Sequence, residues 1–185
     1  MLLQFDRVDS TNTIAWNLLD RGWGDGTIVT AKSQSCGRGQ WGRTWQSEAG
    51  GLYLSMIYLP VVNLADPSLV TIGTVWGIAQ VLSPFVPGLK IKAPNDLLVD
   101  RCKLGGILTE IRWREGKIAA AVIGVGINGW NPVPQGAISL RDLSTPIGNL
   151  EQLRDLTIGG ILLGKERWEQ PNPEGLVADY QTLIL

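Results

Sequence analysis

The stretch KLGGILTEIRWREGKIAAAVIGVGIN, residues 103–128, decides the expected fold. Residues 104–113 and 117–125 are two apolar runs rich in β-branched side chains. Between them, Arg114-Glu115-Gly116 is a short polar turn that contains glycine. Two runs of this kind joined by such a turn predict an antiparallel β-hairpin. We therefore expect a sheet built around this pair of strands.

The segments on either side of the hairpin add helices and shorter strands. Further strands are expected at residues 27–31, 52–59, 89–92 and 97–99, and helices are expected after Asp9-Ser10-Thr11-Asn12, after Asp66-Pro67, over 150–168 and over 175–185. Short polar residues before an apolar helical stripe mark a helix start. Several antiparallel strands occur together instead of alternating with helices, which predicts an α+β fold and not a doubly wound one.

Length and composition indicate one globular domain. The chain has 185 residues, 44% hydrophobic and 18% charged, and single domains usually hold about 100–200 residues. Its longest apolar run, residues 118–127, is far shorter than the ~20 residues of a membrane span. The first residues, MLLQFD, lack the basic start and apolar core of a secretion signal. A soluble cytoplasmic protein that does not bind membranes is expected.

The absence of histidine restricts the possible catalytic chemistry more than any other feature of the composition. It excludes Ser-His-Asp catalysis, Cys-His catalysis and most zinc sites. The two cysteines, Cys36 and Cys102, do not form a disulfide framework, which fits a reducing compartment. A net charge of −1 provides no general basic field, so no binding to DNA is expected.

A glycine-rich segment, residues 35–45, is the first candidate site. Its glycines match the spacing G-x-G-x-x-G, but a strand follows instead of a helix, and no Gly-Lys-Ser/Thr closes it. Dinucleotide-binding and Walker-type loops are therefore excluded. Arg38 and Arg43 suit phosphate or carboxylate oxygens, and Trp41 or Trp45 suits a flat ring. A solvated loop without a ligand remains the alternative.

Three other segments carry weaker signals. Asn95 and Asp96 follow Lys92-Ala93-Pro94, where they form either an ordinary turn or oxygen ligands for Mg²⁺ or a ribose. Lys103 precedes Gly105-Gly106, a pair typical of close approach by a ligand, although Lys103 also fits a surface lysine. Asn128 ends a strand after Gly124 and Gly126, as it would in a simple turn.

Taken in order, these segments resemble the catalytic domain of the biotin protein ligases, also called biotin–[acetyl-CoA-carboxylase] ligases. The matching pieces are Asp9-Ser10-Thr11-Asn12, Gln34, Gly37-Arg38-Gly39, Gly42-Arg43, Trp45, Leu52-Tyr53-Leu54-Ser55, Lys92 with Pro94-Asn95-Asp96, Lys103-Leu104, Gly106-Ile107-Leu108, Gly124 and Gly126-Ile127-Asn128. Each piece is weak alone, but the ordered set is specific. The resemblance implies a mixed, mostly antiparallel sheet backed by helices, as in class II aminoacyl-tRNA synthetases.

The resemblance also implies the reaction and its residues. Biotin and ATP would form biotinyl-5′-AMP and pyrophosphate, and a lysine of a biotin carboxyl carrier protein would then accept the biotin. It assigns catalysis to Lys103 and Arg38, biotin contacts to Ser10, Thr11, Asn12, Gln34, Arg38, Gly39, Gln40, Lys103 and Gly106, ATP contacts to Arg38, Arg43, Trp45, Asn95 and Asn128, and Mg²⁺ contacts to Asp96 and Asn128. Cations would offset the repulsion between carboxylate and phosphate, so no histidine is needed.

The sequence departs from the family pattern at several points. Gln40 and Ala93 stand where many relatives have arginine and tryptophan. We expect one catalytic domain over residues 1–185, without the N-terminal DNA-binding domain or C-terminal β-barrel-like domain of some relatives. The strand ending at Trp113 is a candidate edge for a homodimer, and a monomer remains equally open.

Two alternatives to a biotin ligase remain open. A lipoate ligase shares the expected fold and adenylation chemistry, but its usual motif contains a histidine, which this chain lacks. A non-catalytic remnant would bind biotin or a carrier protein without chemistry. Gln40 favours the remnant, whereas the presence of Lys103, Arg38 and Arg43 argues against it.

Overall fold

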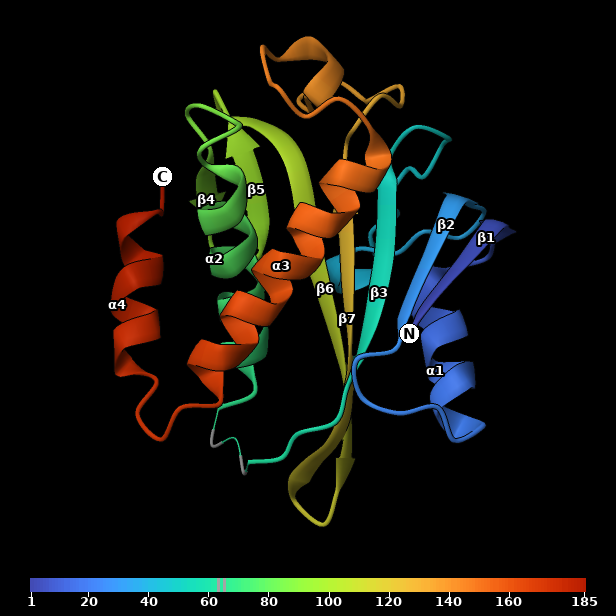
Figure 1. Cartoon of the computed structure of the whole chain (residues 1–185), viewed down its shortest axis with the longest axis vertical. Helices are drawn as coiled ribbons and strands as arrows, with labels where there is room; N and C mark the ends of the chain where they lie inside the picture. Colours follow the sequence, from blue (N-terminus) through green and yellow to red (C-terminus); the bar gives the residue numbers. More distant parts are fainter. Residues whose placement is uncertain (63, 65) are drawn as a thin grey trace.

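The computed structural model describes residues 1–62, 64 and 66–185 and shows one sheet with helices on both faces (Figure 1). The strands are β1 (Leu2–Val8), β2 (Ile28–Gln34), β3 (Leu52–Tyr58), β4 (Lys90–Lys92), β5 (Asp96–Val99), β6 (Cys102–Arg114) and β7 (Lys117–Ile127). The helices are α1 (Thr11–Asp20), α2 (Ser68–Leu82), α3 (Leu150–Trp168) and α4 (Glu174–Thr182), with short 3₁₀ turns at Gln40–Gly42 and Leu140–Asp142.

The sheet is mixed and mostly antiparallel. Its strand order is β1-β2-β3-β7-β6-β5-β4, and among these described strands the β1–β2 pair is parallel and the others are antiparallel. The hairpin of β6 and β7 lies at its centre, and Glu115 and Gly116 turn the chain with φ of 51° and 74°. Left-handed backbone at both positions matches the right-handed twist of the two strands. The fold expected from the sequence is confirmed.

Helices α2, α3 and α4 cover one face of the sheet, and α1 covers the other (Figure 1). The larger core lies between the sheet and α2 and α3, and includes Trp76, Leu104 and Trp168. A smaller core joins Ala15 of α1 to the opposite face through Val29 and Val122. The beginning of α1 is thereby fixed against the sheet.

Two sequence-based expectations need correction. The edge strand β1 was not predicted, because only Val8 of its seven residues is buried and the strand shows no apolar alternation. Helix α1 begins at Thr11 as expected, yet the side chain of Ser10 makes no capping hydrogen bond. Instead the Ser10 backbone N–H donates to Asp9 Oδ1 at 2.7 Å. The Ser10 side chain is therefore not committed to the helix end.

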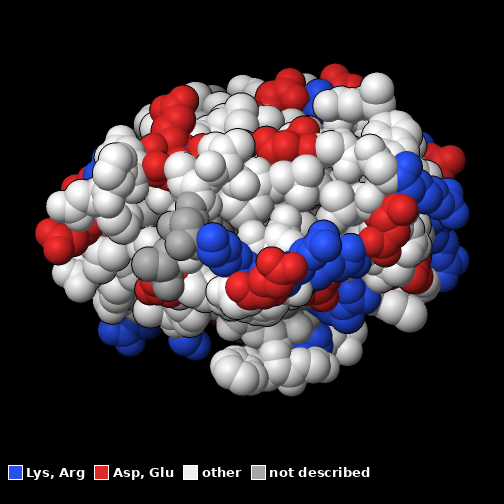
Figure 2. Space-filling view, turned by 90° about the horizontal axis from the view of Figure 1, so that it is seen from below, with Lys and Arg blue, Asp and Glu red and all other residues white. Residues whose placement is uncertain are grey.

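Charges on the surface are mixed. Figure 2 shows basic and acidic side chains beside one another in a band from the centre to the right of the face that it draws, between wide uncharged areas. This agrees with the net charge of −1. Among the described residues, no helix combines the length and apolar content that crossing a membrane requires.

Helices α2 and α3 cross at glycines. A Cβ added to Gly160 would lie 2.6 Å from the Ile78 Cα atom, and one added to Gly77 would overlap the Gly160 carbonyl oxygen. Only hydrogen-sized side chains let the two backbones approach this closely. The neighbouring Gly159 has no atom within 4 Å of its added Cβ, so it provides a matched control in the same helix.

We predict that Gly160→Ala lowers the free energy of unfolding by about 1–3 kcal/mol, because the extra methyl group forces the helices apart. Gly159→Ala should raise it by up to about 1 kcal/mol, since alanine favours helix. Urea denaturation of both variants measures this difference. Equal stabilities of the two variants would show that the helix crossing is not closely packed.

Candidate active site

A cavity of about 540 Å³ opens on the α1 side of the sheet, where the glycine-rich loop meets the ends of several strands. Every residue predicted for the site lines this cavity: Ser10, Thr11, Asn12, Gln34, Arg38, Gly39, Gln40, Arg43, Trp45, Asn95, Asp96, Lys103, Gly106 and Asn128. These residues come from five separate segments of the chain. The fold therefore brings residues from segments that are each weak indicators alone together at one site.

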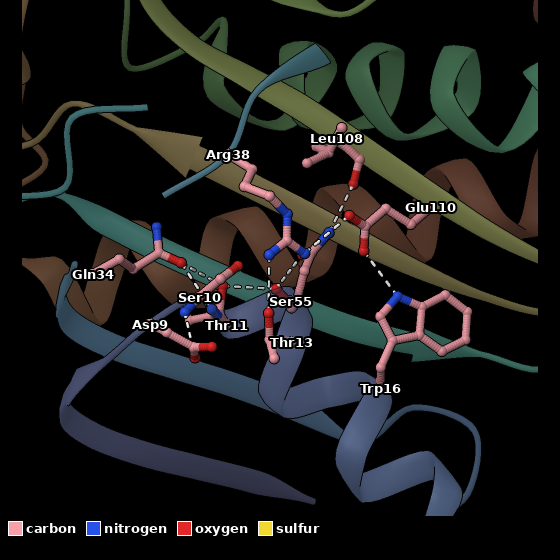
Figure 3. Close-up of polar contacts among 11 residues, drawn as sticks. Asp9, Ser10, Thr11, Thr13, Trp16, Gln34, Arg38, Ser55, Leu108 and Glu110 are labelled. Atoms are coloured by element: carbon pink, nitrogen blue, oxygen red, sulfur yellow. Dashed lines mark hydrogen bonds and ion pairs between the residues drawn. The ribbon is translucent and has the colours of Figure 1, made fainter. Parts of the chain in front are cut away.

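One wall of the cavity is a buried hydrogen-bond network at the start of α1 (Figure 3). Gln34 Oε1 accepts from the Thr11 backbone N–H at 2.8 Å and from Thr11 Oγ1 at 3.1 Å. Ser55 Oγ lies 2.7 Å from Thr11 Oγ1 and 2.6 Å from Asn12 Oδ1. Gln34 Nε2 donates to Ser47 Oγ at 2.8 Å. A fully paired network of this kind holds its polar groups in fixed directions.

Two glycines on β7 leave space for the Asn12 side chain of this wall and for the Trp45 ring. A Cβ on Gly124 would overlap Asn12 Oδ1, and one on Gly126 would lie 2.6 Å from Trp45 Nε1. The Trp45 indole therefore packs directly over backbone. Its Nε1 is buried without a hydrogen-bond partner among the described residues, so no hydrogen bond of the indole sets the position of the ring.

Lys103 extends into the cavity from the beginning of β6. Its Nζ forms an ion pair with Asp96 Oδ1 at 2.7 Å and lies 5.3 Å from the centre of the Trp45 ring. A Cβ on Gly106 would lie 3.3 Å from the same amine. The carboxylate, the aromatic face and the glycine together fix a cation beside open space.

Arg38 brings a second cation to the cavity from the glycine-rich loop. Its Nη1 donates to Thr13 Oγ1 at 2.9 Å, and its Nη2 contacts Glu110 Oε1 at 3.0 Å (Figure 3). Gly39 N donates to the Arg43 carbonyl at 2.7 Å, which closes the loop on itself. Arg43 is exposed at the rim, and Trp41 at the tip of the loop is 90% exposed with a φ of 59°.

The side-chain amides of two asparagines in the cavity donate hydrogen bonds to backbone carbonyls. Asn95 Nδ2 donates to the Ile107 carbonyl at 2.6 Å. Asn128 Nδ2 donates to the carbonyls of Lys103 and Ile138 at 3.2 and 3.1 Å, and its Oδ1 accepts from Asn131 at 3.3 Å. These bonds place the Lys103 strand correctly, and the predicted contacts of Asn95 and Asn128 with a nucleotide remain predictions.

The donor set does not fit a metal site made by protein alone. Among the described residues, no group of three or more His, Cys, Asp or Glu side chains is arranged to hold an ion. Asp96 is the only carboxylate among the described residues that line the cavity, and Lys103 already neutralises it. The Asn128 amide oxygen is bonded to Asn131.

The structure adds three residues beside the cavity to those that the sequence predicts. Ser47 and Glu110 were not predicted at all, and Thr13 was taken only as part of a helix. Glu110 gave one signal, because it is the lone acid within an apolar strand. Its partner Arg38 is 72 residues away in the sequence, so only the structure connects the two.

Comparison with known proteins agrees with this geometry. The profile of the biotin/lipoate A/B protein ligase family matches residues 4–128. The bifunctional ligase/repressor BirA of Bacillus subtilis is 32% identical over 149 residues, which cover 79% of this chain and 46% of that protein. This chain thus spans about half the length of that relative. The biotin–[acetyl-CoA-carboxylase] ligase of Mycobacterium tuberculosis is 28% identical over 98% of this chain and 71% of its own length.

Solved structures show the same fold. The biotin protein ligase from Aquifex aeolicus, in complex with biotin and ATP, has a TM-score of 0.82 at 22% identity, covering 100% of this chain and 78% of that one. The enzyme from Leishmania major, in complex with biotinyl-5-AMP, has a TM-score of 0.81 at 20% identity, covering 100% and 81%.

We predict that Ser55→Ala weakens the buried wall, because Thr11 and Asn12 each lose a partner. The expected loss is about 1–3 kcal/mol of unfolding free energy, which lowers Tm by about 2–4 °C per kcal/mol. Thermal unfolding followed by circular dichroism measures it. Ser33→Ala, at a partly exposed site whose Oγ donates one long hydrogen bond, to the Asp6 carbonyl at 3.4 Å, should change Tm little. The same shift in both variants would refute the assignment.

Proposed function

The chain belongs to the biotin/lipoate A/B protein ligase family, and from this premise we propose that it activates biotin with ATP and transfers it to a lysine of a carrier protein. One observation carries the proposal. The cations of Lys103 and Arg38 line the same cavity as the polar wall of Ser10, Thr11 and Gln34. A ligand with a polar ring system at one end and a carboxylate at the other fits such a cavity.

In the first half-reaction, a carboxylate oxygen of biotin attacks the α-phosphorus of ATP. A bond from that oxygen to phosphorus forms, the bond to the bridging oxygen breaks, and pyrophosphate leaves with the electron pair. Both reactants are anions, so the barrier contains a large repulsion. Fixed cations at the place where negative charge develops lower it. Lys103, whose amine is held by Asp96 and Trp45, is suited to that role.

In the second half-reaction, the ε-amine of a carrier lysine attacks the carbonyl carbon of biotinyl-5′-AMP. An amide bond forms, AMP leaves, and the amine loses a proton. The mixed anhydride is reactive toward water, so the cavity has to exclude solvent until the carrier lysine binds. The glycine-rich loop, with exposed Trp41 and Arg43 at its rim, is suited to close over the adenylate.

Biotin is favoured over lipoate. The chain has no histidine for the usual lipoate ligase motif, and the relatives described above are named biotin ligases or the ligase/repressor BirA. Ser10, Thr11, Asn12, Gln34, Gly39, Gln40 and Gly106 would surround biotin, while Arg38, Arg43, Trp45, Asn95 and Asn128 would contact the nucleotide.

The partners follow from the reaction. The acceptor would be the biotin carboxyl carrier protein of a carboxylase, encountered in the cytoplasm. Mg²⁺ would arrive on the ATP phosphates, because this cation commonly binds through substrate phosphates and one or two carboxylates. Among the described residues that line the cavity, Asp96 is the only carboxylate that could contact such an ion. Binding to DNA is not part of the proposal. A homodimer formed through sheet edges belongs to it, with the second half of the strand ending at Trp113 as the candidate edge, because β5 pairs with β6 only as far as Gly106.

We predict that wild-type protein, biotin, Mg-ATP and a carrier domain raise the carrier mass by one biotin. Lys103→Ala should slow this by roughly 100-fold or more, because the developing charge loses its nearest cation. Lys117→Ala is the control, since this exposed lysine lies at the far end of the β6–β7 hairpin. Intact protein mass spectrometry measures the product. An unchanged rate in Lys103→Ala would contradict the proposed mechanism. Biotin binding by the wild-type protein without pyrophosphate release would favour a non-catalytic remnant.

A second prediction concerns Gln40, which lines the cavity on the loop and carries no charge. Replacing it with arginine adds a cation near the phosphate of the adenylate and should improve retention. We expect Gln40→Arg to reduce released biotinyl-5′-AMP by about fivefold, the effect of roughly 1 kcal/mol for a partly exposed ion pair. Biotinylation of a non-carrier protein such as albumin serves as the assay. Equal labelling by both proteins would contradict this role of Gln40.

A further inference from the structure

Arg38 is held in place before any ligand is bound. Its guanidinium bridges two elements, with Nη1 on Thr13 of α1 at 2.9 Å and Nη2 on Glu110 of β6 at 3.0 Å. The other carboxylate oxygen of Glu110 accepts from Trp16 Nε1 at 2.8 Å (Figure 3). Each oxygen of Glu110 therefore has its own donor, one from the loop and one from α1.

Glu110 is the fixed member of this group and Arg38 the movable one. Glu110 lies within β6, opposite Val122 of β7, and its carboxylate is also tied to the Trp16 indole. Arg38 lies between Gly37 and Gly39 in a connection outside the sheet, where the backbone bonds on either side of it, from Gly39 N to the Arg43 carbonyl and from Trp45 N to the Gly37 carbonyl, stay within the loop. A residue in a long hydrogen-bonded strand pair opens far less readily than one in a surface loop. The carboxylate thus anchors the loop, and not the reverse.

We propose that Glu110 is a positioning residue, which holds Arg38 against the cavity and thereby restrains the glycine-rich loop before any ligand binds. The proposal deepens the proposed function, on which it rests only for the identity of the anion that Arg38 receives. Glu110 does not line the cavity and touches no reacting atom. It acts through Arg38.

The anchor leaves Arg38 able to bind a ligand. Only Nη1 and Nη2 contact other described residues, so Nε–H and the second protons of both terminal nitrogens remain as donors. A guanidinium already directed into the site loses less conformational freedom when an anion arrives. Preorganised donors of this kind also need no rearrangement during the chemical step.

The test uses tryptic cleavage after Arg43, an exposed site in the same loop. In the ligand-free protein, Glu110→Gln should speed this cleavage by roughly fivefold, the effect of losing one partly exposed ion pair. Trp16→Phe keeps an aromatic ring but removes the N–H that holds Glu110, so it should speed cleavage in the same direction by a smaller factor. This second variant keeps the test decisive if Glu110→Gln folds poorly.

Two controls separate anchoring from general destabilisation. Asp20→Asn removes a comparable pair, Arg112 to Asp20 at 2.6 Å, which also joins α1 to β6 but does not involve the loop. It should leave cleavage after Arg43 unchanged. In an Arg38→Ala background, Glu110→Gln should have no further effect on cleavage, because two residues that act as a unit are not additive. The same non-additivity is expected for kcat/KM of pyrophosphate release.

Three outcomes would contradict the anchoring role of Glu110. Additive effects in the Arg38→Ala background, or unchanged cleavage in Glu110→Gln, would overturn the proposal. A higher kcat/KM in Glu110→Gln would also overturn it, since Glu110 would then be a competitor that the substrate anion displaces. Failure of biotin and ATP to yield pyrophosphate would defeat the proposed function alone, because the cleavage measurements contain no ligand.

Discussion

The site depends on keeping two cations in one cavity before any anion reaches them. Lys103 is paired with Asp96 at 2.7 Å, and Arg38 with Glu110 at 3.0 Å. Unpaired, the two positive groups would repel each other and turn toward solvent, where charges are better hydrated. Both carboxylates come from the strands β5 and β6, so the sheet itself sets the directions of the cations. The rest of the fold supports this arrangement.

Close approach of backbone to side chains supplies the space around these charges. Gly124 and Gly126 on β7 admit the Asn12 amide and the Trp45 ring, and Gly106 on β6 leaves room beside the Lys103 amine. Larger side chains on these strands would fill the cavity. The central hairpin therefore both forms the core on one face and leaves the other open, and α1 reaches that open face because Ala15 packs against it.

Much of this was accessible from the sequence, for physical reasons. The β6–β7 hairpin and the long helix α3 follow strong periodic patterns, and Lys103, Arg38 and the glycines occur in an ordered set that is specific to one family. The edge strand β1 was missed because most of its side chains face solvent and show no alternation. Glu110, Ser47 and Thr13 were missed because each acts through a partner that is distant in sequence, and one-dimensional patterns carry no such pairing.

The central claim is that this cavity joins biotin to the α-phosphate of ATP. Exchange of radiolabelled pyrophosphate into ATP measures that step directly, without a carrier protein. We predict exchange that begins only when biotin is added and that lipoate does not support. Absence of exchange with biotin at saturating Mg-ATP, or equal exchange with lipoate, would contradict the account.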